Sequence, residues 1–155
     1  MIERHVMGLE DMMILHRIGH LGASRAKDIL MPFDPAFFLT LLRLDSPTHD
    51  AAVHMACMHI TLLNEALAQA QYADRPLEAQ YAVSPKGEVI HLITRDRKGL
   101  RNFWKISEEA VPHAYQLRFL EAKAAKHGGI ARVLSSTERS FREKRVEVMP
   151  WEAML

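Results

Sequence analysis

Residues 91–105, HLITRDRKGLRNFWK, combine the side-chain types that hold nucleic acid. Five cations are interleaved here with Phe103 and Trp104: Arg95, Arg97, Lys98, Arg101 and Lys105. Lysine and arginine contact phosphates, and aromatic rings stack on bases. The competing interpretation is structural: a strand leaves the core, turns at Lys98 and Gly99, and leaves its charges in solvent. Phe103 and Trp104 then anchor the next helix, and this is the role we expect for the two rings.

A second basic cluster lies near the C-terminus, in the last hairpin that the sequence predicts. Its members are Arg139, Arg142, Lys144 and Arg145. Lys86 adds a cation at the tip of an earlier hairpin, as in the wing of a winged-helix protein. Helix 35–45 is too apolar to lie in a DNA groove, however, so we do not expect a winged helix. The two clusters form a nucleic-acid surface if the fold places them side by side, and the sequence does not decide this.

Nine histidines raise the question of a metal site. His16 and His20 stand four residues apart, a spacing that can present two ligands from one helix. The segment HRIGH lacks the glutamate of the H-E-x-x-H pattern, and Gly19 weakens a helix at that point. On the helix expected around residue 57, His54 and His59 diverge by about 140° and Cys57 faces the apolar side. We therefore expect no metal site and no cofactor.

Catalytic patterns are equally sparse. Cys57 lies among Met, Ala and Ile, where a thiol behaves as a small hydrophobic group. The pair Glu121 and Lys123 has the E-x-K spacing of some nucleases, in which the pair lies on a strand and meets a metal-binding aspartate. Here the pair falls within an expected helix, about 200° apart, and cannot form that site. No nucleophile elbow or Gly-rich phosphate loop occurs, so we expect no catalytic residues and an enzyme is the least favoured class.

Composition sets the class of protein. The 155 residues are 48% hydrophobic and 25% charged, which is typical of one globular domain spanning residues 1–155. A single cysteine, the charged start of the sequence and the lack of a long apolar run predict a cytoplasmic protein outside the membrane. The net charge is +1. Residues 1–75 carry six Lys/Arg against nine Asp/Glu and residues 76–155 carry fourteen against ten, so an anionic partner would meet the second half.

The first half has the apolar spacing and capping signals of helices. We expect helices near residues 9–18, 24–30 and 35–45, the last with Asp34 as N-cap and Pro35 at its first position. A longer helix follows Ser46 and Pro47 and reaches Tyr72. Its apolar arc covers well over half of its circumference, which predicts either the central helix of the domain or part of a homodimer interface.

The second half changes to the period of strands. Segments 78–84 and 88–94 read as a hairpin turning at Pro85-Lys86-Gly87. A helix should run from Ser107 to about His127, with Gly128 ending it. IARVLSS and KRVEVMP are two further strands around a polar turn. The expected fold class is α+β: an N-terminal layer of three to four helices over residues 1–75, followed over residues 76–155 by a ββαββ unit with antiparallel hairpins.

These features predict a small non-enzymatic protein that binds nucleic acid, in a regulatory role, through its basic C-terminal half. The alternative is a protein–protein interaction module, an adaptor or an inhibitor. Such a module would use an apolar surface supplied by the nine methionines, or a dimer interface.

Overall fold

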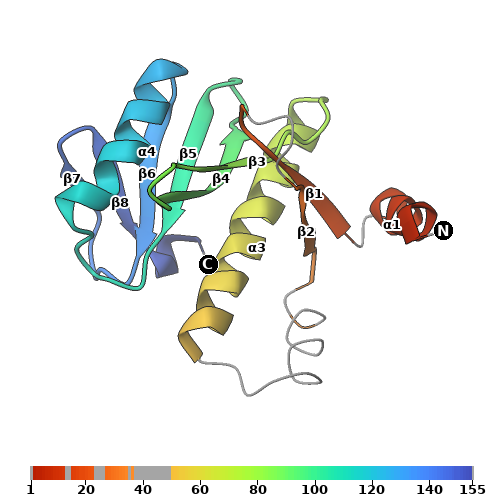
Figure 1. Ribbon diagram of the computed structural model, residues 1–155, viewed down its shortest axis with the longest axis horizontal. Helices are drawn as coiled ribbons and strands as arrows, with labels where there is room; N and C mark the ends of the chain where they lie inside the picture. Colours follow the sequence, from red (N-terminus) through yellow and green to blue (C-terminus); the bar gives the residue numbers. More distant parts are fainter. Residues whose placement is uncertain (1, 13–14, 23–26, 35, 37–49, 155) are drawn as a thin grey trace.

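The computed structural model describes residues 2–12, 15–22, 27–34, 36 and 50–154. These residues form eight strands of one mixed sheet and three α-helices, followed by a short 3₁₀-helix (Figure 1). The helices are α1 (Ile2–Asp11), α3 (Asp50–Tyr72), α4 (Ala114–Lys126) and the 3₁₀-helix η1 (Trp151–Met154). The strands are β1 (Leu15–His20), β2 (Ile29–Pro32), β3 (Gln80–Val83), β4 (Val89–Arg95), β5 (Arg101–Ile106), β6 (Ile130–Ser135), β7 (Phe141–Glu143) and β8 (Val146–Pro150).

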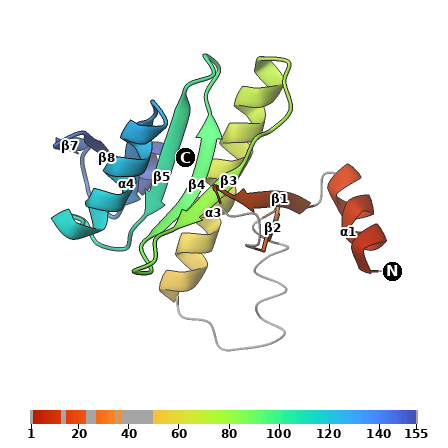
Figure 2. The same cartoon turned by 45° about the horizontal axis from the view of Figure 1, so that its top comes forward.

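The sheet has the strand order β2-β1-β3-β4-β5-β6-β8-β7. Strands β3, β4 and β5 form an antiparallel meander, and β6 then runs parallel to β5 after the α4 crossover. Helix α3 packs on one face of the sheet and α4 on the other (Figures 1 and 2). We refer to these as the α3 face and the α4 face.

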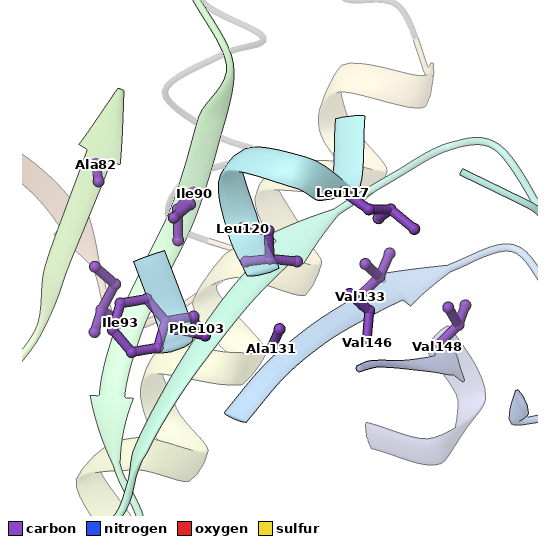
Figure 3. Packing of buried hydrophobic residues seen from close by; sticks show 11 residues of the cluster. Ala82, Ile90, Ile93, Phe103, Leu117, Leu120, Ala131, Val133, Val146 and Val148 are labelled. Carbon is purple, nitrogen blue, oxygen red and sulfur yellow. The ribbon is translucent and has the colours of Figure 1, made fainter. Parts of the chain in front are cut away.

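Each face has its own apolar core because side chains alternate along the strands. On the α4 face, Phe103 of β5 packs with Leu120 of α4 and Val133 of β6 (Figure 3). On the α3 face, the neighbouring Trp104 packs with Leu63 of α3 and Leu134 of β6. Strand β5 is therefore covered on both sides, as a central strand should be.

The expected N-terminal helical layer is wrong. Helix α1 ends at Asp11, and residues 15–20 form strand β1, which pairs in parallel with β3 and so joins the same sheet as the second half. The segment does not have a helical apolar stripe: Ile18 is buried while its neighbour Arg17 is exposed, which is the alternation of a strand. Residues 29–32, expected at the end of a helix, form β2.

Two of the expected helices fall wholly or partly outside the described residues. Helix 35–45 is one of them, although the Ala36 N–H donates to Asp34 Oδ1 at 2.8 Å, as an N-cap aspartate would accept it. Residues 24–26 of the expected helix 24–30 are also outside, and the end of that helix is instead the start of β2. The long helix is confirmed as α3 from Asp50 to Tyr72, and its N-cap at Ser46 lies outside the described residues.

The ββαββ unit is also wrong, since the second half is βββαβββ. The hairpin is confirmed as β3 and β4, but the basic stretch that follows forms the additional strand β5. Helix α4 begins later than expected, at Ala114 with His113 as N-cap, and the Ser107 N–H instead bonds the Leu134 carbonyl. Gly128 ends the helix with φ 65°, as predicted.

The last two expected strands do not form a hairpin with each other. They are β6 and β8, which pair in parallel, while β7 pairs antiparallel with β8 at the sheet edge. The tight β7–β8 reversal places Lys144 at φ 56°.

Candidate functional site

The strand register brings part of both basic clusters to one end of the sheet. Asn102 pairs with Ile130, and Ala131 pairs with Val146, so Arg101 and Arg145 stand almost level on strands separated by β6. Two strand spacings amount to about 10 Å. The β4–β5 turn, the start of β6 and the start of β8 all lie at this end, which is uppermost in Figure 1.

The C-terminal turn of α4 adds cations to the same end. Lys123 and Lys126 lie in its last turn, and His127 follows as the C-cap. Arg101 Nη1 lies 3.4 Å from His127 Nδ1. Burial and then repulsion from Arg101, Lys123 and Lys126 lower the pKa of His127. The local potential around this imidazole is therefore positive.

Arg145 approaches the same helix from the other side. It borders a small groove with Gly129 of the α4–β6 turn and with Glu121 of α4. We define the basic rim as the basic side chains at this end of the sheet and of α4. It consists of Lys98, Arg101, Lys123, Lys126, His127, Lys144 and Arg145.

Two cations of the stretch 91–105 serve the fold instead. Arg95 Nε bonds Glu78 Oε2 at 2.6 Å, and this bond lowers the pKa of Glu78. Arg97 Nε bonds Gln69 Oε1 at 2.9 Å, and its guanidinium lies 4.1 Å from the centre of the Tyr72 ring. These contacts fix the β4–β5 turn to the end of α3.

The remaining predicted cations lie elsewhere. Lys86 is in the β3–β4 turn and Arg139 follows β6, so both are at the opposite end of the sheet from the basic rim. Lys105 is near the end of β5, where burial lowers its pKa while Glu88 and Glu109 oppose that shift. Arg142 lies on the edge strand β7, paired in register with Glu147. The ten predicted residues therefore do not form one surface.

Phe103 and Trp104 are buried, in the two cores on opposite faces of β5. They anchor the strand, as expected from the structural interpretation, although the element they anchor is a strand rather than a helix. Neither ring is exposed as a base-stacking platform on the basic rim.

The histidines do not converge either. Among the described residues, no group of three His, Cys, Asp or Glu side chains is arranged to hold a metal ion. His16 stacks on Phe33, with ring centres 3.2 Å apart, and His59 lies beside His91 at 6.3 Å. Burial lowers the pKa of His59 to about 4 and that of His91 to about 3. Glu121 and Lys123 lie on α4, so their E-x-K spacing has helical geometry.

Sequence reasoning missed the contribution of α4. The sequence analysis considered only the apolar sides of this helix, so it did not include the basic residues Lys123, Lys126 and His127. The available signal was the sequence KAAKHGG: cations concentrated in the last helical turn, directly before the glycines that turn the chain back to the start of a strand.

Part of the wide apolar arc of α3 is buried within the chain. Ile60 and Leu63 pack on the sheet, and Asn64 Nδ2 donates to the Phe33 carbonyl at 2.9 Å. Met31 and Met58 are buried in the same core. Val53, Ala56, Cys57 and Leu67 of the same arc are half-buried, so a dimer interface on this helix stays a prediction.

Helices long and apolar enough to cross a bilayer are not found in the described part of the chain. Comparison of the chain with protein-family models, with curated proteins and with solved structures gave no significant match.

Proposed function

We propose that the protein binds nucleic acid in a regulatory, non-enzymatic role and that the basic rim is its phosphate-contacting surface. The observation that supports this proposal is the convergence of Arg101, the end of α4 and Arg145 at one end of the sheet. Cations on three separate elements can contact several phosphates along one strand.

The rim also has the charge balance that the proposal needs. Three carboxylates lie near it, against six Lys and Arg side chains and His127. They are Asp96 in the β4–β5 turn, Glu121 at the groove and Glu143 in the neighbouring strand. Arg101 is held in place by β5 and His127, so its charge is presented from a rigid strand. The basic rim itself offers no exposed aromatic ring for base stacking, since Phe103 and Trp104 are buried.

The test is a salt titration of binding to a generic DNA duplex and to single-stranded DNA, with the triple variant Arg101→Ala/Lys126→Ala/Arg145→Ala. Each lost phosphate contact reduces the slope of log K against log salt by about 0.9, so the slope should fall by roughly 2 to 3. Affinity at about 0.1 M salt should fall about 10- to 100-fold.

A matched control removes three exposed cations outside the rim: Lys86→Ala/Arg118→Ala/Arg139→Ala. The net charge changes equally, so this variant should lose much less affinity if the rim is the contact surface. Equal losses in both triple variants would show that only overall charge matters. Absence of binding at low salt would overturn the proposal.

A further inference from the structure

A cavity of about 360 Å³ lies on the α3 face, between α3, the sheet and η1. Its floor is formed by residues that alternate on β4 and β5, namely Thr94, Asn102 and Trp104. Helix α3 supplies Glu65, and β6 supplies Arg132. We call this space the Asn102 cavity. Its volume is in the range of small-molecule sites.

Asn102 makes the cavity unusual. The residue is 4% exposed, and its Oδ1 has no hydrogen-bond partner among the described residues. Its Nδ2 reaches the Leu100 carbonyl at 3.5 Å, the limit of a hydrogen bond. An unpaired buried acceptor destabilises the folded protein. A ligand that donates an N–H to Oδ1 would remove that destabilisation.

The other walls narrow the chemistry of the ligand. Trp104 and Met149 are apolar, as are Leu62 and Met154 above them, which suits a flat ring. The Arg132 guanidinium lies 5.4 Å from the centre of the Trp104 ring, and its Nε bonds Glu147 Oε2 at 2.8 Å.

The polar groups are of complementary kinds. Glu65 and Asn102 Oδ1 accept hydrogen bonds, whereas Arg132 donates them. Gln69 donates to Glu65 Oε1 at 2.6 Å and holds that carboxylate at the cavity wall. A planar ring with adjacent N–H and C=O groups would satisfy both kinds at once.

The floor of the cavity does not have the arrangement of a metal-dependent E-x-K nuclease site. In such a site, alternate residues of a central strand lie beside an acidic residue of the next strand. Here the alternate residues are an amide and an indole, and the facing β4 residue is Thr94. The carboxylates that line the cavity are Glu65 of α3 and Asp96 after β4, and the described residues hold no group of three potential metal ligands.

We propose that the Asn102 cavity binds a guanine-type nucleobase, with its N–H edge toward Asn102 and Glu65 and its carbonyl toward Arg132. The ring stacks on Trp104. The base comes either from a free nucleoside or from an unpaired guanine of a strand. The proposal does not depend on the basic rim, because the cavity lies on the α3 face and the rim lies mainly at the end of α4.

The experiment follows the Asn102 side-chain amide and the Trp104 indole N–H by heteronuclear NMR during titration with guanosine. Both resonances should shift together and saturate. With 1-methylguanosine, which lacks the ring N–H donor, affinity should fall at least about tenfold on the unaltered protein. Asn102→Leu should cause a similar loss.

The matched control is Asn64→Leu, which changes the same residue type on the same face but outside the cavity and should leave guanosine affinity unchanged. A lack of shifts at millimolar guanosine, or equal affinity for the two nucleosides, would overturn the proposal. So would unchanged affinity in Asn102→Leu.

A further arm distinguishes the two sources of the base. Single-stranded oligonucleotides containing one guanine or one adenine are titrated at high salt, where contacts of the basic rim are suppressed. Binding of the guanine strand with shifts at Asn102 and Trp104 assigns the site to a base of a strand. Shifts with guanosine alone assign it to the free nucleoside. Both of these results can still be interpreted if the basic rim does not bind DNA.

Discussion

The two faces of the sheet differ in how completely their polar groups are satisfied. The α4 face is closed by aliphatic side chains and Phe103, with α4 packed directly on the strands (Figure 3). The α3 face contains six buried side-chain atoms without partners among the described residues. These atoms are His16 Nε2, His20 Nδ1, His59 Nε2, Asn64 Oδ1, Asn102 Oδ1 and Trp151 Nε1.

This contrast indicates that the two faces have different roles. Native cores satisfy almost all buried polar groups, so an excess of unsatisfied groups on one face lowers the stability of that face. The Asn102 cavity lies on that face as well. We therefore propose the α3 face as the site of a small ligand, in addition to the phosphate contacts proposed for the basic rim.

The strongest test of the contrast compares two buried leucines on helices that cover opposite faces. Leu120→Ala on α4 should reduce the free energy of unfolding by about 3–5 kcal/mol. Leu62→Ala on α3 should cost about 2–3 kcal/mol, because Leu62 already borders the cavity and loses fewer packing contacts. Urea denaturation of both variants measures the difference, and a larger cost for Leu62→Ala would remove the distinction between the faces.

The second test is the pH dependence of stability. His59 and His91 on the α3 face have pKa values of about 4 and about 3, well below the ordinary 6.5, because both are buried. The unfolded chain therefore takes up protons first. The two neutral imidazoles make their full contribution to the free energy of unfolding above about pH 6.5. This contribution is lost as the pH falls toward 4, by roughly 2 kcal/mol per pH unit near pH 5.

Unfolding free energies measured from about pH 7 to about pH 4.5 check this slope. The double variant His59→Asn/His91→Asn removes both titrating groups. The amide oxygen that it introduces at position 91 can still accept the Ile106 N–H, which now bonds His91 Nδ1 at 3.0 Å. Its slope should be shallower than that of the unaltered protein. Identical slopes would show that these two imidazoles do not carry the acid sensitivity.

The third test probes how tightly the α4 face is built. A Cβ on Gly129 would lie 2.6 Å from Phe103 Cε2 and 2.7 Å from the Arg101 carbonyl oxygen. Gly129→Ala should therefore cost about 2 kcal/mol. Gly19→Ala, where the Cβ meets Asp28 Oδ1 at 3.7 Å, is the control and should change stability by less than about 0.5 kcal/mol. Equal thermal unfolding midpoints would contradict the close packing of β6 on β5.

Several single elements followed from local patterns, but the expected fold class did not hold, and the errors have physical causes. The Pro and Gly turn indicated the β3–β4 hairpin, and the apolar arc indicated α3. Strand β1 was missed because HRI is short and flanked by glycine, and its pairing with β3 joins residues about sixty positions apart. No local pattern specifies such a pairing.

The candidate site shows the same limit. The cations could be recognised from residue types, but their division between two ends of the sheet depends on the direction of each strand. Strand β5 was not recognised in the sequence because one of its faces carries two cations, Arg101 and Lys105. The residues on its other face are buried: Asn102, Trp104 and Ile106. The Asn102 cavity combines β4, β5, β6 and α3, so only the folded chain reveals it.

The most direct test of the central claim is the stability of Asn102→Leu. If the α3 face keeps an unpaired acceptor for a ligand, then replacing Asn102 by leucine should raise the free energy of unfolding by about 1–2 kcal/mol in urea, without ligand. The same variant should no longer be stabilised by guanosine, which should stabilise the unaltered protein. A loss of stability in Asn102→Leu would contradict the claim, because Asn102 would then be a satisfied structural residue.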